Sequence, residues 1–293
     1  MKIITFDIGG TFIKYALCDE KFRLSQSTKF PTDAKQGGRK LIEKVIEIVK
    51  AHKDVERVAI STAGQVDSTT GTIVYATDTI PGYTGMKIKE MVESATSVLT
   101  YVENDVNSAA LGEAYFGKAK GYNEFISLTY GTGIGGAIWL NGDLYKGSLC
   151  SAGELGHIIT HANGKNCTCG GNGCYECYAS ASALVRSVNE VSDEELDGVK
   201  IFSEENFSNP VIRNKIDQWI DEIVIGLTSI VYTFNPSLIV LGGGIMNEDF
   251  IVNEINDRIQ NKLMQSFRNV KIVNSDLGNT AGMLGVAYKA SLM

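Results

Sequence analysis

Two pairs of short apolar runs, each joined through a glycine turn, organise the chain. The first pair covers residues 2–8 and 12–18 and turns through Gly9-Gly10-Thr11. The second pair covers residues 125–130 and 134–140 and turns through Gly-Thr-Gly. β-rich arms joined through glycine are typical of β-hairpins, so both pairs predict antiparallel strands.

Segments of helical periodicity separate the other apolar runs. Between residues 38 and 50 the apolar positions recur at helical spacing, which predicts a helix. Further helices are expected at 87–94, 104–116, 179–191, 210–234, 249–266 and 280–290. Single strands are expected at 57–61, 98–103, 238–241 and 270–273, a hairpin with an irregular loop at 62–85, and an irregular acidic stretch at 192–209.

The repeated hairpin predicts two similar α/β halves that flank a cleft. A polar, glycine-bearing break after residue 116 marks the first boundary. We therefore expect an N-terminal lobe of residues 1–118, rejoined by the C-terminal helix at 280–293. Residues 119–279 are expected to form the second lobe.

Composition and charge narrow the class of protein. The chain has 293 residues, of which 44% are hydrophobic and 21% charged, as in an ordinary globular protein with an ample core. Its formal net charge of −7 does not suggest a nucleic-acid or membrane-surface partner, since both favour clustered Lys and Arg. The chain shows neither a long apolar run nor a basic-then-apolar leader, so we expect a cytoplasmic protein.

A cluster of cysteines and histidines between residues 150 and 178 predicts a metal site. Cysteine thiolates and a neutral imidazole favour four-coordinate zinc, and reduced cytosol disfavours disulfides. Glycines between the cysteines let the backbone fold tightly around an ion. The expected zinc ligands are His157, Cys167, Cys169 and Cys174.

Other interpretations of this cluster stay open. Cys177 and His161 are near enough in sequence to compete as ligands, and the stretch could simply be free thiols in a glycine loop. His157 is preferred because the Glu-Leu-Gly-His context places it beside Glu154. Cys18 and Cys150 lie in other contexts and are expected to be buried small hydrophobic residues.

The first glycine hairpin carries a candidate phosphate and magnesium site. Backbone N–H groups of Gly9 and Gly10 can approach an anion, and Thr11 adds a hydroxyl donor. Asp7, at the strand end, is suited to a hydrated Mg²⁺, which prefers carboxylate and water oxygens. The alternative is a plain hairpin turn.

The second glycine hairpin formally matches Gly-x-Gly-x-x-Gly through Gly131, Gly133 and Gly136. A dinucleotide-binding interpretation requires a helix to begin there, whereas the following residues predict a strand and a turn. A second phosphate-binding hairpin remains, with Thr132 as the side-chain donor. Two such hairpins favour a nucleotide triphosphate as the ligand.

The Glu-Asn-Asp stretch at 103–105 ends a strand and opens a helix. Asp105 is either a helix cap or a general base that accepts the proton of a sugar hydroxyl as it attacks phosphorus. Asn104 beside it could orient the same sugar. Further along, the glycines at 242–244 follow a buried strand, which suits either an adenine slot or close helix packing.

With these motifs in place, the chain resembles the ROK family of sugar kinases within the actin/hexokinase-like superfamily. The resemblance runs from Asp7 to the C-terminal Ala-Gly-Met-Leu-Gly-Val-Ala, nearly the whole chain. The most specific parts are the Glu-Leu-Gly-His box and the Cys-x-Cys-x-x-x-x-Cys-x-Glu run. It implies an actin/hexokinase-like (ribonuclease H-like) α/β fold with two lobes.

The resemblance also implies a role for each motif residue. Asp105 would be the catalytic base for the sugar 6-hydroxyl, and His157 would bind zinc through one ring nitrogen and face the sugar with the other. Implied sugar-site residues are Gly64, Asn104, Asp105, Glu154, His157 and Glu176. Implied nucleotide-site residues are Asp7, Gly9, Gly10, Thr11, Gly131, Thr132, Gly133, Gly135, Gly136, Gly243 and Gly244.

Two departures from the family pattern leave the substrate open. Ala63 stands where the family often has proline, and Thr79 stands where it commonly has an asparagine that touches the sugar. Cys177 stands where alanine is common, which argues against a ligand role. The resemblance implies an ATP- and Mg²⁺-dependent hexose kinase with structural zinc, most simply a homodimeric glucokinase. An N-acetylmannosamine or other N-acetylhexosamine kinase is the alternative.

Functions of other classes are disfavoured. Sugar-responsive repressors of the family carry a DNA-reading segment ahead of the first hairpin, and this chain begins six residues before Asp7. A zinc hydrolase needs an open coordination position, which a site of three cysteines and one histidine does not provide.

Overall fold

The computed structural model describes residues 1–293, and their contacts divide them into two units. The first unit comprises Met1–Gly121, Leu144–Ala152 and Asn279–Met293. The second comprises Tyr122–Asp143 and Gly153–Gly278. The short piece at 144–152 therefore groups with the first unit, although the sequence had suggested one continuous lobe from 119 to 279.

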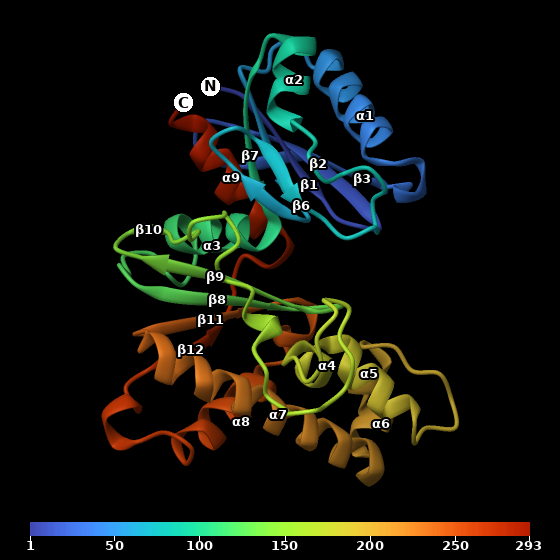
Figure 1. The fold of residues 1–293 in the computed structure, drawn as a ribbon, viewed down its shortest axis with the longest axis vertical. Helices are drawn as coiled ribbons and strands as arrows, with labels where there is room; N and C mark the ends of the chain where they lie inside the picture. The colour runs from blue at the N-terminus through green and yellow to red at the C-terminus, as the bar shows by residue number, and fades with distance from the viewer. The chain divides into compact units, whose positions relative to one another are not determined.

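A five-stranded mixed sheet in the order β3-β2-β1-β4-β7 forms the centre of the first unit (Figure 1). Its strands are β1 (Ile3–Ile8), β2 (Phe12–Cys18), β3 (Leu24–Pro31), β4 (Arg57–Thr62) and β7 (Leu99–Asn104). β1 and β2 pair antiparallel with Asp7 opposite Lys14, and β4 runs parallel to both β1 and β7. A separate hairpin joins β5 (Gln65–Asp67) and β6 (Thr72–Tyr75).

Helices cover both faces of this sheet because its central strands are apolar on both sides. Ile4, Phe6 and Ile8 of β1 contribute to a core shared with helices α1 and α2. Ile3 faces the opposite side, where it joins residues of helix α9. The helices of this unit are α1 (Gly38–Ala51), α2 (Ile88–Thr96), α3 (Asp105–Phe116) and α9 (Ala281–Ser291).

Helices α3 and α9 approach each other through glycines. A Cβ on Gly112 of α3 would lie 2.3 Å from the carbonyl oxygen of Ala281, and one on Gly285 of α9 would lie 2.0 Å from that of Ser108. No larger residue fits at either position without shifting the backbone. This close crossing fixes α3, whose first turn carries Asp105.

The second unit has its own five-stranded sheet, in the order β10-β9-β8-β11-β12. Its strands are β8 (Phe125–Tyr130), β9 (Ile134–Leu140), β11 (Leu238–Gly242) and β12 (Lys271–Asn274), with β10 (Asp143–Leu144) at the edge. β8 and β9 are antiparallel, and β11 is parallel to β8 and β12. Its helices are α4 (Glu176–Ala179), α5 (Ala181–Asn189), α6 (Glu204–Ser208), α7 (Pro210–Phe234) and α8 (Asp249–Gln260).

Helix α7 is the longest element of the second unit and begins as its sequence predicts. The Asn209 side chain accepts a hydrogen bond from the Val211 N–H, and Pro210 occupies the first helical position, where a missing N–H is tolerated. In Figure 1, α7 and α8 lie side by side below the sheet. The Arg258 side chain on α8 pairs with Asp217 and Asp221 of α7, which joins the two helices.

The structure differs from the predictions in several places, among them the following. Strand β3 was not predicted, because its residues are mostly exposed and it is held at the sheet edge by backbone pairing. The helix expected to reach residue 266 ends at Gln260. The stretch at 192–209, expected to be irregular, contains the short helix α6.

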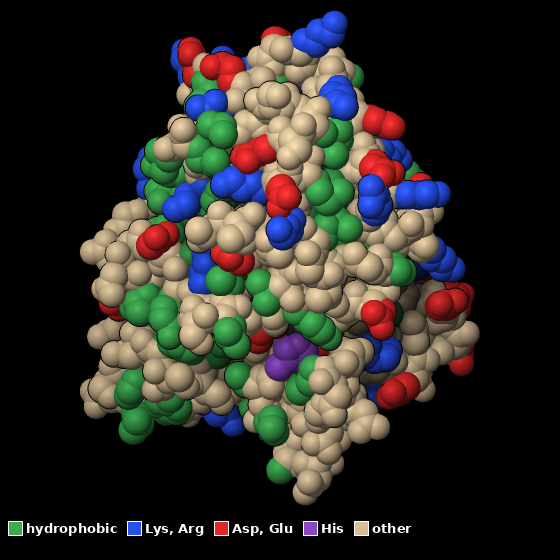
Figure 2. Space-filling model, turned by 45° about the horizontal axis from the view of Figure 1, so that its top comes forward, with side chains coloured by type: hydrophobic (Ala, Val, Ile, Leu, Met, Phe, Trp, Pro, Cys, Tyr) green, Lys and Arg blue, Asp and Glu red, His purple; other side chains and the backbone are tan.

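No helix combines the length and apolarity that a membrane crossing requires. On the face shown in Figure 2, Lys and Arg side chains are interspersed with Asp and Glu.

Candidate active site and metal centre

The turn between β7 and α3 settles whether Asp105 is a helix cap. The cap is Asn104, whose Oδ1 accepts hydrogen bonds from the N–H groups of Val106 and Asn107, both at 3.0 Å. Its Nδ2 donates to the Gly64 carbonyl at 2.9 Å and to Asp105 Oδ1 at 2.8 Å. The sequence left open that Asp105 caps the helix, but the N-cap residue is Asn104. Asp105 is the first helical residue, and its Oδ1 shares the Val106 N–H with Asn104 at 3.0 Å.

The environment of Asp105 makes it a weaker acid than usual. Burial, and after it the negative charge of Asp7, raise the pKa of Asp105 to about 6, although hydrogen bonds from Val106 and Asn104 oppose the shift. A carboxylate with a pKa nearer neutrality is a better proton acceptor. The half-buried Asp105 is thus chemically suited to general-base work near neutral pH.

Gly64 supports this turn through its backbone. Its φ is +97°, and a Cβ would lie 3.0 Å from the Tyr75 carbonyl oxygen, so a side chain is disfavoured twice. The Gly64 carbonyl holds the Asn104 amide. Both hydrogens and the oxygen of that amide are engaged within the protein, so a sugar hydroxyl would have to replace one of these bonds.

Asp7 lies at the end of β1 with two polar neighbours that the sequence analysis did not select. Lys14 Nζ is 3.5 Å from Asp7 Oδ2, and Ser61 Oγ donates to Asp7 Oδ1 at 3.4 Å. Burial raises the pKa of Asp7, whereas Lys14 and Ser61 oppose that shift. The hairpin register that sets Asp7 opposite Lys14 was the signal that could have found this lysine.

The glycine turn that follows Asp7 is tight and open to solvent at its tip. The Gly9 N–H donates to the Phe12 carbonyl at 3.0 Å, and Thr32 Oγ1 donates to the Gly9 carbonyl at 2.7 Å. Gly10 and Thr11 are exposed. A Cβ on Gly10 would lie 3.2 Å from Thr79, which places the atypical Thr79 beside this turn.

The second glycine hairpin connects β8 to β9, and a strand follows it rather than a helix. The helix that a dinucleotide-binding turn requires is therefore missing here, as the sequence predicted. Thr132 is exposed at the tip, with Gly131 beside it. Gly136 lies within β9, where a Cβ would be 2.5 Å from the Gly153 carbonyl oxygen, so this glycine has a packing reason of its own.

The glycines after β11 lie next to this hairpin within the second unit. Gly243 has a φ of +102°, and a Cβ there would be 2.1 Å from the Tyr130 carbonyl oxygen at the end of β8. Gly244 opens a short 3-10 turn (Gly244–Asn247) and has open space around it. Two of the three glycine stretches predicted to bind nucleotide, 131–136 and 242–244, are thus adjacent.

Glu176 joins the second hairpin to the cysteine-rich loop. Its Oε2 accepts a hydrogen bond from the Ile134 N–H at 3.3 Å, and its Oε1 accepts one from Cys167 Sγ at 3.2 Å. A Cβ on Gly133 would lie 2.3 Å from Glu176 Oε2, so a side chain there would displace this carboxylate. The loop is anchored further by the buried Tyr175, whose hydroxyl donates to the Ile223 carbonyl of α7 at 2.9 Å.

The four predicted zinc ligands form one cluster. The ligand atoms of His157, Cys167, Cys169 and Cys174 all lie within 4.8 Å of one another. Cys169 Sγ is 3.6 Å from Cys174 Sγ, and Cys167 Sγ is 3.6 Å from His157 Nδ1. Zinc–sulfur bonds of about 2.3 Å in a tetrahedron separate two sulfurs by about 3.8 Å, so the donor set fits a closed zinc site.

The two ring nitrogens of His157 face different groups. Nδ1 faces Cys167 and lies 3.8 Å from Glu176 Oε1, whereas Nε2 lies 3.9 Å from Glu154 Oε2. One nitrogen is therefore available to a metal and the other faces a carboxylate. Glu154, His157 and Glu176 form one polar group around this imidazole.

The competing ligands lie outside the cluster. Cys177 Sγ contacts the Asn166 carbonyl at 3.7 Å, and His161 Nε2 is 3.5 Å from Glu222 Oε1. Cys18 is fully buried, as expected, and burial raises the pKa of its thiol to about 12. Cys150 is only half-buried, so the expectation of a buried residue was wrong for it, because it lies in an exposed loop.

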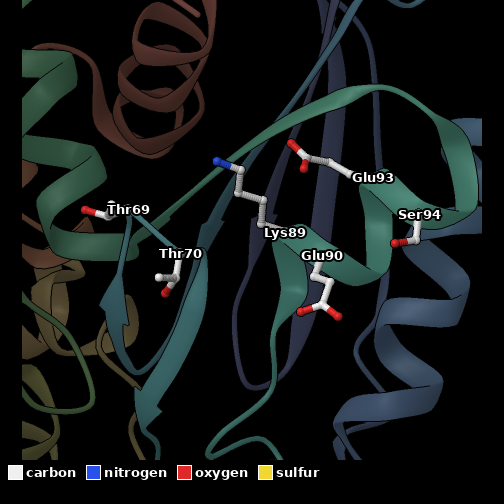
Figure 3. A pocket seen from close by; sticks show the side chains of 6 residues that line it. All are labelled: Thr69, Thr70, Lys89, Glu90, Glu93 and Ser94. Carbon is white, nitrogen blue, oxygen red and sulfur yellow. The ribbon is translucent and has the colours of Figure 1, made fainter.

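A separate pocket of about 280 Å³ contains none of the predicted site residues. Figure 3 shows its six side chains, which come from the β5–β6 turn and helix α2. They are Thr69, Thr70, Lys89, Glu90, Glu93 and Ser94.

Comparisons with known proteins point to one family. The ROK family profile matches residues 3–291. A beta-glucoside kinase of Listeria monocytogenes is 31% identical, covering 98% of this chain and 97% of its own. The structure of a ROK family glucokinase from Streptomyces griseus, in complex with glucose and AMPPNP, has a TM-score of 0.87 at 29% identity and full coverage of both chains.

A third similar protein is a putative N-acetylmannosamine kinase from Listeria monocytogenes. Its structure has a TM-score of 0.88 at 28% identity, covering 100% of this chain and 99% of the other. The α/β architecture, with a glycine hairpin within each five-stranded sheet, is the actin/hexokinase-like fold. The chain belongs to the ROK family.

Proposed function

We propose that the protein transfers the γ-phosphoryl group of Mg·ATP to the 6-hydroxyl of a hexose, with glucose as the first candidate. Its relationship to ROK kinases makes it a sugar phosphotransferase. The named relatives act on different sugars, among them glucose and beta-glucosides, so their names support the class more than the substrate. N-acetylmannosamine is the alternative acceptor.

The observation that carries the proposal is the state of Asp105. The neighbouring Asn104 caps helix α3, and the Asp105 carboxylate, which accepts hydrogen bonds from Asn104 and Val106 through Oδ1, has a pKa raised to about 6 beside Asp7. In phosphoryl transfer a carboxylate that accepts the attacking hydroxyl's proton contributes about 10²- to 10⁴-fold. Asp105 is proposed to take this proton.

The nucleotide is proposed to contact both glycine hairpins and Gly243–Gly244. The exposed tips at Gly10–Thr11 and Gly131–Thr132 offer backbone N–H groups and hydroxyl donors to phosphate oxygens. Asp7 is proposed to hold Mg²⁺ through water. The AMPPNP complex of the Streptomyces glucokinase supports ATP as the donor.

The remaining sugar hydroxyls are proposed to bind Glu154, His157 and Glu176, besides Asn104 and Gly64. When bound, zinc would hold the imidazole of His157 in one tautomer and orientation. Carboxylates on either side of the ring are acceptors for sugar hydroxyls, while Nε2 of His157 can accept or donate. These side chains would orient the acceptor rather than take part in proton transfer.

An ADP-release assay across a panel of sugars tests this proposal. We expect release with Mg·ATP and glucose to exceed release without sugar by at least about 100-fold, since positioning supplies most of the acceleration. Mannose, fructose, N-acetylglucosamine, N-acetylmannosamine and β-glucosides complete the panel. A preference for N-acetylmannosamine would move the substrate to the alternative, and sugar-independent release alone would contradict a sugar kinase.

The pH dependence of kcat/KM for the sugar should show an acidic limb. A general base must be deprotonated, so the raised pKa of Asp105 predicts that activity falls as pH drops through about 6. Above that value the rate should level off. Direct quantification of ADP between pH 5 and 8, in buffers supplied with zinc, checks this expectation. A rate that stays constant over the whole range would exclude Asp105 as the base.

A further inference from the structure

Glu103, two residues before Asp105, is a carboxylate wholly removed from solvent. Its side chain is 0% exposed at the end of β7. Oε1 accepts hydrogen bonds from the Asn104 N–H at 3.1 Å and from Asn107 Nδ2 at 3.2 Å. Oε2 accepts one from the Tyr101 hydroxyl at 3.0 Å. These bonds tie Glu103 to the cap residue and to the first turn of α3.

The charge of Glu103 is balanced by Lys146. The Nζ of Lys146 donates to Glu103 Oε2 and also to Ser68 Oγ in the turn between β5 and β6. A buried carboxylate is strongly unfavourable without a counter-charge, so this lysine is an integral part of the turn. Lys146 is neither the proposed base nor one of the proposed ligands of the nucleotide or the sugar.

Lys146 belongs to a short excursion of the chain. Residues 144–152 group with the first unit, although the residues on either side of them belong to the second. The excursion closes on itself, because the Ala152 N–H donates to the Lys146 carbonyl at 3.0 Å. A second tether joins Ser151 Oγ to Gln65 Oε1 at 3.0 Å.

The excursion is held mainly by polar contacts. Tyr145 and Leu149 are exposed, with Leu149 73% exposed, so little apolar burial fixes this loop in place. The ion pair between the fully buried Glu103 and Lys146, which is 22% exposed, gives the loop the defined geometry that its few apolar contacts do not. Glu154, a proposed sugar ligand, follows Ala152 by two residues.

We propose, on the basis of the kinase function put forward above, that Lys146 is a positioning residue for phosphoryl transfer. It acts through Glu103 on the Asn104–Asp105 turn, and its backbone fixes the loop that continues to Glu154. The ion pair between Lys146 and Glu103 thereby couples the position of Asp105 to that of residues 144–152, which lead to Glu154. Small misplacements matter here, because an error of about 1 Å can lower a rate about 100-fold.

Four variants separate positioning from simple stabilisation. Lys146→Gln leaves Glu103 buried without its counter-charge, and Glu103→Gln with Lys146→Gln removes both charges. Lys146→Arg keeps the charge. Lys87→Gln is the matched control, because Lys87 forms an exposed pair with Glu90 at 3.2 Å in the same unit. Urea midpoints and kcat and KM for both substrates are measured for each, together with hydrogen exchange.

The expected pattern is specific. Lys146→Gln should lower kcat/KM for the sugar about 30- to 100-fold, with the KM for ATP changed less than about threefold. Lys146→Arg should recover most of the activity. The double variant should regain the wild-type urea midpoint while kcat/KM stays at least about tenfold low, because the turn and the loop are no longer joined. Full kinetic recovery in the double variant, or near-normal kinetics in Lys146→Gln, would overturn the proposal.

Failure of this inference is distinguishable from failure of the kinase assignment. Wild-type protein that phosphorylates no sugar refutes the assignment, whatever the variants do. Hydrogen exchange then still reports on the coupling: Lys146→Gln should increase exchange in residues 103–108 and in residues 146–152 together. Unchanged exchange in either segment shows that Lys146 does not join them.

Discussion

Replacing Asp105 with asparagine should remove turnover while the protein continues to bind its sugar. Asparagine keeps Oδ1, so the hydrogen bonds from Asn104 and Val106 are retained. What disappears is the proton acceptor, and kcat should fall by about 10²- to 10⁴-fold. Single-turnover kinetics together with calorimetric titration of the sugar separate the two effects.

The same substitution should stabilise the protein. The raised pKa of Asp105 means that the folded state binds its proton more tightly than the unfolded state, so stability decreases as pH rises toward about 6. Above that pH the buried charge costs about 1–3 kcal/mol, which asparagine removes. The urea midpoint of Asp105→Asn should exceed that of the wild type at pH 8 and approach it at pH 4. Turnover within tenfold of wild type would instead remove Asp105 from the chemistry.

Loss of the metal should have the second largest effect. We expect one zinc per chain, bound by His157, Cys167, Cys169 and Cys174. Chelation should lower kcat/KM for the sugar at least about 100-fold, because the loop between His157 and Glu176 loses the ion that holds it together. Elemental analysis before and after dialysis, followed by assays with Mg²⁺ restored, measures both quantities.

Two cysteines provide a matched pair of variants for this experiment. Cys169 is exposed, so Cys169→Ser removes a ligand with little loss of packing. Cys177, in helix α4, lies outside the cluster, and its Sγ donates to the Asn166 carbonyl. Cys169→Ser should bind zinc at least about 100-fold more weakly, whereas Cys177→Ser should bind it normally. Equal zinc content in the two variants would mean that the ligand set is wrong.

The parts of the structure that were predictable are those in which side-chain pattern and turn chemistry agree. Both glycine hairpins formed as expected, because apolar arms and a glycine turn specify the same pairing. The four predicted zinc ligands lie together in the structure, the cysteines having been chosen from their spacing and His157 from its Glu-Leu-Gly-His context. Strand β3 was not predicted, because backbone pairing rather than an apolar pattern holds it at the edge of the first sheet.

The parts that were not predictable depend on contacts distant in sequence. Whether Asn104 or Asp105 caps α3 depends on the Gly64 carbonyl, 40 positions earlier. Lys146 contacts a carboxylate 43 positions away, and no local pattern marks either residue as a partner. Lys14 was accessible in principle from the hairpin register, because residues opposite each other across a tight turn share one face of the sheet.

Phosphorus NMR of the reaction tests most directly whether the protein phosphorylates a sugar with Asp105 as the base. Zinc-loaded protein is mixed with Mg·ATP and glucose, and the resonances of the product are followed over time. We predict ADP and a phosphomonoester coupled to the two protons on carbon 6, both formed at least about 100-fold more slowly with Asp105→Asn. Inorganic phosphate as the only product for every sugar of the panel, or ester formation at an equal rate with Asp105→Asn, would contradict this mechanism.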